Sequence, residues 1–362
     1  LQHLESVSSF CERKEFCPMW QWRVWNHIIW FVLLVACDSP PSTADPPYET
    51  NPSRVVLHGT CPVETRIGGF WVQSNDTQKY TVIDGLVREA VAAGQWSRVQ
   101  LQEGNCRLLA PRNPFCDPAC SYGEYCDDTG SVTVCRPFPR SRDAGRIVLR
   151  GLLRRVELSP IPPSYNYSYT QLQYPGMISG QVIYLHTSDG FFGSFALYGV
   201  GVDALGTQPE KLVIMRGNDL RLQWESGSFE RARRVFEISV DQHGLEPLTL
   251  SCSFEDTGEG LVPASVVNAL LDAGVSGFPI GRMQLRTEDS VAVAQGCIDF
   301  VVSSIRTLSV EVAGHTPCLR EEDCPPPQHC DTRPDVQQCY TACTIPDDCP
   351  LPQTCNLRGR CE

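Results

Sequence analysis

The sequence predicts a mainly β protein, in which a β-sandwich-like central domain with one short helix is flanked by small disulfide-rich knots. Short apolar runs recur between turn residues over 137–314, and a helical period is clear at 263–274. These two patterns favour the sandwich and its single helix. The third observation is that most of the 19 cysteines lie in closely spaced groups outside the central region, as in small domains that disulfides stabilise.

A secretory segment is predicted near the start of the chain. The apolar run 24–36 has 13 residues, which is too few to cross a bilayer as a helix, since that takes about 20. Arg23 precedes the run and small residues end it, which is typical of a signal peptide. Its end, L-V-A-C at 34–37, resembles the lipobox of bacterial lipoproteins, in which the cysteine thiol takes a diacylglyceryl group. We therefore expect 19–36 to be a lipoprotein signal peptide and Cys37 to be lipidated. The alternatives are an ordinary signal peptide and a buried helix with a chance cysteine.

The residues on either side of this segment fit an anchored protein. Met19 begins a stretch of normal signal length, so translation is expected to start there and 1–18 to be an upstream extension. Five prolines among polar residues follow Cys37. Residues 37–54 are therefore predicted to be the acylated cysteine and a proline-rich tether, partly polyproline II, that reaches about 50 Å at ~3.1 Å per residue.

The charge of the chain argues against nucleic-acid binding. The formal net charge is −12, whereas affinity for nucleic acid is dominated by basic contacts to phosphate. A short basic cluster, R-A-R-R-V-F-E at 231–237, is the exception. We expect it to line an exposed strand or loop.

Residues 55–136 are predicted to form a small Cys-rich domain. The runs at 68–73 and 79–87 are rich in β-branched and aromatic residues and are interpreted as strands. Export places the cysteines in an oxidising compartment, where disulfides persist. The disulfide candidates in this domain are Cys61, Cys106, Cys116, Cys120, Cys126 and Cys135.

Residues 137–314 are predicted to be the β-sandwich-like domain. Leu220, Leu222 and Trp224 alternate with polar residues, so they fall on one face of a strand. The remaining runs are short and separated by turn signals. The predicted strands are 146–153, 180–188, 193–202, 211–215, 219–224, 235–242, 248–254, 290–294, 297–305 and 308–312.

The predicted helix and one predicted bridge also lie in this domain. Pro263 suits the first turn of a helix, and Gly274 suits its C-terminal cap. Between them, Val266, Val267, Leu270 and Leu271 form one apolar face. Cys252 and Cys297 both sit in strand-like runs, and we expect them to form a disulfide with each other.

Residues 315–362 are a tandem four-Cys disulfide repeat. Both halves contain C-x5-C-x5-C, with an acid before the second cysteine and a proline after it. The segment 116–135 shares part of this spacing, which predicts three related knots, each too short for a core. Pairing of first with third and second with fourth is expected, although spacing does not prove connectivity. The disulfide candidates here are Cys318, Cys324, Cys330, Cys339, Cys343, Cys349, Cys355 and Cys361.

Metal binding is the main alternative for the cysteines and for two acidic loops. Structural zinc sites usually contain C-x2-C or C-x4-C pairs, and the closest cysteines here have three residues between them. Calcium takes six or more oxygens at regular spacing, which these loops lack. No metal or other cofactor is therefore expected. The candidate calcium ligands in these loops are Asp127, Asp128, Asp256 and Glu259.

Three motifs are candidates for catalysis or cofactor binding. G-V-G-V-D-A at 199–204 matches a loose dinucleotide pattern, but no helical face follows it. G-V-S-G-F at 274–278 lacks the last glycine of a nucleophile elbow. His243, close to Asp241, has the chemistry of a general base, while Asp–Gln–His–Gly is also typical of a turn. No catalytic residue is predicted.

The chain resembles the Cys-rich, β-rich envelope lipoproteins common in myxobacteria and related groups. The resemblance spans most of 37–362 and rests on the stretches at 34–37, 114–120, 252–271 and 347–355. It implies a lipid-anchored protein of the bacterial cell envelope, with the outer membrane or cell surface favoured over the inner membrane. It implies no characterised activity and supplies no catalytic residues.

The sequence therefore predicts a non-catalytic binding, adhesion or scaffolding module. Its partners are membrane lipid, through acylated Cys37, and an envelope or extracellular protein or glycan. Trp224, Tyr184 and Phe192 are candidates for an aromatic binding face, with core packing as the alternative. An envelope hydrolase acting on glycan or peptide is the alternative function, because sandwich folds host both kinds of protein.

Overall fold

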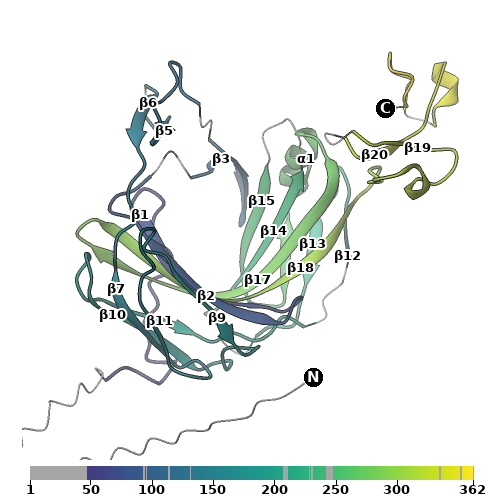
Figure 1. Cartoon of the computed structure of the whole chain (residues 1–362). Coiled ribbons are helices and arrows are strands. Elements are labelled where there is room, and N and C mark those ends of the chain that lie inside the picture. The colour runs from purple at the N-terminus through teal and green to yellow at the C-terminus, as the bar shows by residue number, and fades with distance from the viewer. Residues whose placement is uncertain are drawn as a thin grey trace, which may run out of the picture. The chain divides into compact units, whose positions relative to one another are not determined.

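A ten-stranded sheet runs through the centre of the molecule (Figure 1). Its strand order is β3-β4-β15-β14-β17-β18-β1-β2-β9, and β12 pairs with β18 beside this path. The strands are β1 (Arg66–Asn75), β2 (Tyr80–Val87), β3 (Arg98–Glu103), β4 (Cys106–Ala110), β9 (Tyr167–Leu172), β12 (Lys211–Ile214), β14 (Arg233–Asp241), β15 (Thr249–Glu255), β17 (Ser276–Val293) and β18 (Gly296–Val312).

The computed structural model describes residues 47–361 except 93, 95, 113–114, 131, 207–210, 228, 230, 242–247, 334–335 and 351–352. The predicted upstream extension, the signal peptide, Cys37 and most of the predicted tether lie outside the described residues, as does His243. In the described part of the chain, no helix is long and apolar enough to cross a membrane.

The long hairpin of β17 and β18 runs through both halves of the large sheet, the half that contains β1 and the half that contains β12. Its strands are 18 and 17 residues long. At one end β18 pairs with β1, and at the other end it pairs with β12. From Cys297 to Ile305 every residue of β18 is buried, because both faces are covered, whereas beyond Arg306 burial alternates.

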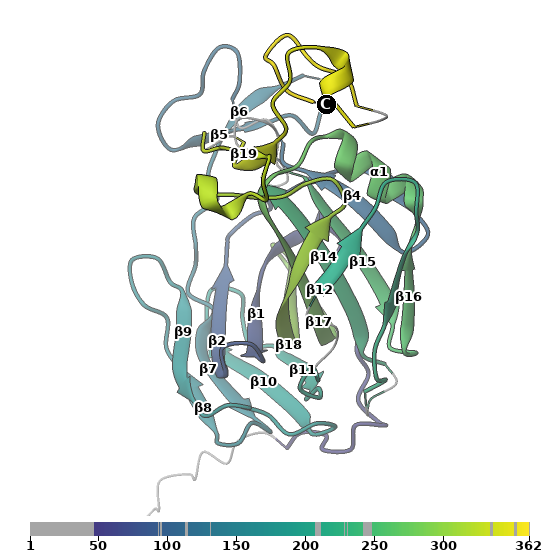
Figure 2. The same cartoon turned by 90° about the vertical axis from the view of Figure 1, so that its right-hand side faces the viewer.

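Two smaller sheets and the helix cover the large sheet (Figures 1 and 2). The sheet β11-β10-β7-β8 covers one half, and Thr287 of β17 bonds the backbone of Val200 in β11. The pair β13 and β16 and helix α1 cover the other half. These elements are β7 (Gly145–Arg150), β8 (Val156–Leu158), β10 (Val182–Asp189), β11 (Ala196–Val200), β13 (Leu220–Gln223), β16 (Glu259–Val262) and α1 (Ala264–Asp272).

The structure confirms the mainly β fold class with one α-helix in the central region. Helix α1 begins after Pro263 and buries Val266, Val267 and Leu270, as its period predicts. The chain leaves the helix at Gly274, whose φ of 100° suits glycine. One continuous apolar core fills both halves of the fold.

The predicted boundary at 136/137 does not separate two sheets. β1 to β4 come from the predicted Cys-rich domain, yet they are strands of the same large sheet as β14 to β18. β1 lies between β18 and β2 because its apolar face completes the core, where Phe70 is buried. The part of 55–136 that remains a separate small motif is the knot with β5 (Glu124–Asp127) and β6 (Val134–Pro137).

The predicted bridge between Cys252 and Cys297 is wrong. Cys252 of β15 lies opposite Cys106 of β4 and is bonded to it, and Cys297 is bonded to Cys61. The physical reason is strand order, since β14 and β17 lie between β15 and β18. Both bridges therefore tie the predicted N-terminal domain to the predicted sandwich.

The knots have the expected connectivity. In each, the first cysteine pairs with the third and the second with the fourth. The first C-terminal knot contains β19 (His329–Asp331), β20 (Gln338–Tyr340) and a short 3-10 turn, Glu321–Asp323, and the second contains the turn Pro346–Asp348. The pairs are Cys116–Cys126, Cys120–Cys135, Cys318–Cys330, Cys324–Cys339, Cys343–Cys355 and Cys349–Cys361.

The folded unit starts earlier than the predicted end of the tether at residue 54. The ring of Tyr48 stacks on Tyr184, with 4.9 Å between ring centroids, and the Arg150 guanidinium lies over it. Arg231 donates hydrogen bonds to the carbonyls of Pro52 and Val55. These contacts attach residues 48–55 to the sheets, so any tether must end before Tyr48.

Candidate binding cleft

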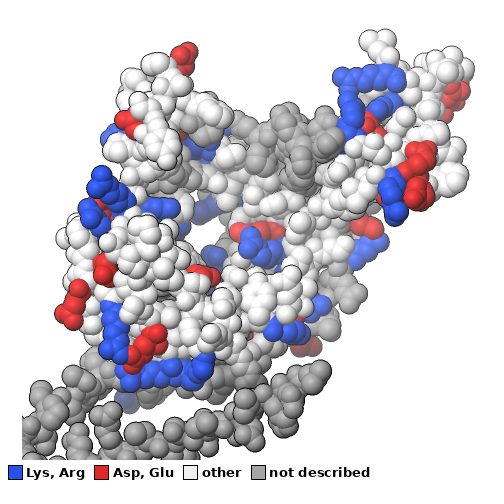
Figure 3. All heavy atoms as spheres, viewed as in Figure 1, with Lys and Arg blue, Asp and Glu red and all other residues white. Residues whose placement is uncertain are grey.

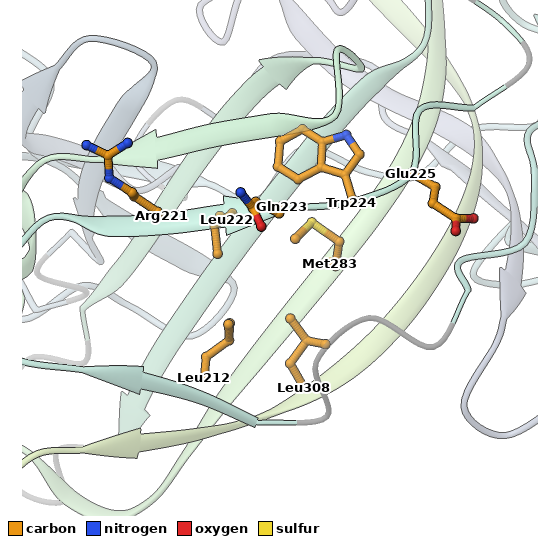
Figure 4. A pocket seen from close by; sticks show the side chains of 8 residues that line it. All are labelled: Leu212, Arg221, Leu222, Gln223, Trp224, Glu225, Met283 and Leu308. Atoms are coloured by element: carbon orange, nitrogen blue, oxygen red, sulfur yellow. The ribbon is translucent and has the colours of Figure 1, made fainter.

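An apolar cleft of about 520 Å³ opens between β12 and β13 (Figure 4). Its floor is formed by Met283 of β17 and Leu308 of β18, both buried. Leu212 stands on the β12 side. Volumes of roughly 300–1,000 Å³ with mostly apolar walls are typical of small-molecule sites. The full lining is Leu212, Arg221, Leu222, Gln223, Trp224, Glu225, Met283 and Leu308.

The cleft exists because two consecutive strands join different partners. β12 pairs in parallel with β18, whereas β13 pairs antiparallel with β16. They are connected by a tight turn, in which the Asn218 N–H donates to the Met215 carbonyl. No strand pairing joins β12 to β13 among the described residues. The space between their facing edges therefore stays open above the core.

The alternation along β13 gives the cleft an apolar wall and a polar rim. Leu222 and Trp224 are 3% and 7% exposed. Arg221, Gln223 and Glu225 lie between or beside them and are exposed. A ligand in this cleft would meet apolar carbon at the floor and charged or amide groups at the mouth.

Trp224 is held in place by a buried ion pair. The Arg234 guanidinium lies 5.3 Å from the indole centroid and donates to Asp256 at 2.8 Å. The two charged side chains are 3% and 1% exposed. Burial lowers the pKa of the Arg234 guanidinium, and the Asp256 carboxylate opposes that shift.

The same pair fixes the chain that follows β13. Arg234 also donates to the Glu225 carbonyl, and the Gly227 N–H donates to the second oxygen of Asp256 at 2.6 Å. These additional hydrogen bonds use donors and acceptors that the ion pair itself leaves over, which a buried pair requires in order to be stable. The cleft wall is therefore preformed.

The four candidate calcium ligands do not form one cluster of carboxylates. Asp127 accepts from Arg136 and Thr129, and Asp128 accepts from Arg112. Asp256 belongs to the buried pair with Arg234, and Glu259 lies opposite Gln223 on β16. In place of an oxygen cluster, three of these four carboxylates have arginine partners.

The cysteine triplets have suitable distances for a metal but not suitable chemistry. In each knot three sulfurs lie within 4.8 Å of one another. All of them are bonded in disulfides, and zinc binds the thiolate. While the knots are oxidised, these sulfurs cannot serve as zinc ligands.

The structure describes the two glycine-containing motifs, at 199–204 and 274–278, and neither has the local structure that its candidate role requires. Residues 201–206, after β11, form no helix, so the glycine pattern has no helix N-terminus to offer. Ser276 is buried at the start of β17.

Among the described residues, the structure shows one His–Asp contact that the sequence did not indicate. The distance between Nδ1 of His58 and Oδ1 of Asp289 is 2.8 Å. Asp289 also accepts the backbone N–H groups of His58 and of Tyr198 in β11, so it joins the segment before β1 to β11.

The three candidate aromatic residues do not form one face. Tyr184 is covered by Tyr48, and Phe192 is part of the core. Trp224 alone of the three lines the cleft.

Comparison of the chain with protein-family models, curated proteins and solved structures finds no match. The cleft, the surface and the sequence are therefore the features from which a function is inferred.

Proposed function

We propose that this chain is a lipid-anchored, non-catalytic binding protein of the bacterial cell envelope, and that the β12/β13 cleft holds a small ligand with an apolar part. The observation that carries the proposal is the preformed cleft itself. Its floor is apolar, and its tryptophan wall is held by the buried Arg234–Asp256 pair. Preformed sites bind without the cost of ordering their walls.

The anchor rests on the sequence and on the oxidised state of the cysteines. L-V-A-C at 34–37 and the prolines after it are typical of a lipoprotein, and sixteen cysteines form eight disulfides, as in an exported protein. We place the protein in the outer membrane or on the cell surface. Cys37→Ser should abolish labelling by radioactive palmitate and membrane retention, and unchanged retention would contradict the anchor.

An envelope hydrolase is the alternative. Glycoside hydrolysis commonly uses two carboxyl groups flanking the bond, and the cleft lining contains one carboxylate, Glu225. This composition favours binding. Turnover of an envelope glycan or peptide by the folded protein, lost in Glu225→Gln, would favour the hydrolase.

The cleft is tested with a neutral apolar probe, phenylnaphthylamine, whose fluorescence rises on binding. Leu212→Trp fills the cleft and should weaken probe binding by about tenfold or more. Val213→Trp is the matched control, because it adds the same ring to the next residue of β12, which is 51% exposed. If Leu212→Trp folds normally and binds as tightly as Val213→Trp, the cleft is not the site.

A further inference from the structure

A second groove, of about 420 Å³, lies on the other face of β14 and β17 from the apolar cleft. Side chains alternate between the two faces of a strand. Arg234 and Met283 face the core, so Arg233 and Arg286 face the opposite side. Arg107 of β4 lines the same groove.

Three arginines from separate strands converge on this groove. Arg233 of β14 lies directly opposite Arg286 of β17. Arg107 lies opposite Ser251, and Ser253 lies opposite Val235 between the arginine positions. Like charges directly opposite each other on a sheet are destabilising. The placement of Arg233 opposite Arg286 therefore lowers the stability of the folded protein unless a negative charge compensates it.

The acidic residues near the groove neutralise it only in part. Arg286 pairs with Glu288, which is the one carboxylate in the lining. Arg233 donates to the hydroxyl and carbonyl of Ser253 at 3.4 and 3.3 Å. Glu255 lies opposite Arg233 on β15, but no ion pair joins them among the described residues.

Arg107 is the least engaged of the three arginines. Its guanidinium makes no hydrogen bond or ion pair with the residues that the structure describes. Three arginines and one glutamate give the lining a net charge of +2, in a chain with a formal net charge of −12. Figure 3 shows basic and acidic side chains interspersed over the face of the molecule that it presents.

We infer that this groove binds an acidic carbohydrate, with a carboxylate of the sugar held by Arg107 and Arg233. The planar guanidinium matches a carboxylate in a bidentate geometry. The rest of the lining is rich in hydrogen-bonding groups such as Ser251, Ser253 and Thr60, which suit sugar hydroxyls. The groove is also much larger than a single inorganic anion requires. This inference does not depend on the apolar cleft, which lies on the other face.

The test uses a short oligogalacturonate and its methyl ester, which has the same hydroxyls without the charge. Binding to the folded unit, residues 48–362, is measured by titration calorimetry. Arg107→Gln and Arg233→Gln remove the proposed contacts one at a time. Arg282→Gln is the matched control, because Arg282 lies on β17, as Arg286 does, and pairs with Glu237, but it does not line the groove.

We expect the acid to bind, the ester to bind at least about tenfold more weakly, and affinity to fall as salt rises. Each groove variant should weaken binding by about tenfold or more, since hydrogen bonds to charged groups are the stronger class. Arg282→Gln should change the dissociation constant less than about twofold. No binding at millimolar acid, equal binding of the ester, or inorganic phosphate competing as well as the sugar would overturn the inference. Thermal midpoints exclude misfolding as the cause of any loss.

Discussion

In the sheet region, two disulfides join residues that are 236 and 146 positions apart, and a continuous apolar core lies between the sheets. In the three knots, each disulfide joins residues 10 to 15 positions apart. The buried clusters of the two C-terminal knots consist of their own cysteines. The sheets therefore have a core that bridges reinforce, whereas the knots have bridges in place of a core.

This difference decides what each region loses without a bridge. In the chain-entropy model, a short loop of this kind contributes about 3 kcal/mol and a loop longer than 100 residues about 5 kcal/mol. The long bridges are worth more, but the sheets also bury large side chains such as Phe70, Phe236 and Phe300. Without its bridge, a knot has no comparable buried side chains to stabilise it.

The largest expected effect is the loss of one whole knot. Cys318→Ala with Cys330→Ala should remove hydrogen-exchange protection from the Cys339 amide, which donates to the Thr316 carbonyl at 2.8 Å. The Phe236 amide in the sheet should stay protected, and so should the Cys343 amide in the neighbouring knot. A knot that keeps its protection without this bridge would show that it has a core after all.

The next effect is large but leaves the fold intact. Cys106→Ala with Cys252→Ala removes the bridge between β4 and β15 and should lower the free energy of unfolding by about 5 kcal/mol. The sheet should still form, because Leu108 and Leu250 stay packed in the core. Denaturant titration followed by near-UV circular dichroism measures both. Loss of the cooperative transition would mean that the sheet depends on its bridges as the knots do.

The buried Arg234–Asp256 pair shows how much burial strengthens an ion pair within the sheet region. Arg234→Met leaves Asp256 buried and unpaired, which should cost about 3–5 kcal/mol. Replacing both residues, Arg234→Met with Asp256→Leu, should recover most of that loss. Arg282→Met is the control, since its pair with Glu237 is half exposed and should contribute less than about 1 kcal/mol. Equal losses in Arg234→Met and Arg282→Met would contradict a special role for burial.

Local features of the fold could be predicted from the sequence, and long-range ones could not. The alternation at 219–224 and the cysteine spacing within each knot depend on neighbours along the chain. The partner of Cys252 depends on strand order, which no local pattern encodes. Most of β17, residues 276–289, was not predicted as a strand. At its start Gly277, Pro279 and Gly281 interrupt the alternation with residues typical of turns.

The two candidate sites, the cleft and the groove, could likewise be predicted only in part from the sequence. The sequence identified Trp224 and the face of β13 it lies on, but the floor of the cleft comes from β17 and β18. The cluster R-A-R-R was expected on an exposed strand or loop, yet its arginines have three different environments. Arg231 holds residues before β1, Arg233 lines the groove, and Arg234 is buried. Alternation separates Arg233 from Arg234, while only the tertiary structure supplies the partners of each.

The smallest expected effect is a pH dependence at the junction of the two C-terminal knots. The Asp331 carboxylate is 4% exposed and pairs with Arg333 and with Arg360 of the second knot. Hydrogen bonds from Arg333, and then from Arg360, hold the pKa of Asp331 well below its usual range, although burial opposes this.

Because the folded-state pKa of Asp331 is depressed, its contribution to stability is complete above the unfolded-state pKa of about 3.9 and is lost as pH falls below it. Exchange of the Cys361 amide, which donates to the Thr341 carbonyl, should therefore show increasing local opening as pH is lowered through that range, after correction for the intrinsic rate. Asp331→Asn should show more opening at neutral pH and a flatter pH dependence. Glu322→Gln removes the same charge from a side chain that is 67% exposed and should leave the profile unchanged. If Asp331→Asn keeps the original profile, the two knots are joined by their backbone alone, and the carboxylate contributes nothing to the junction.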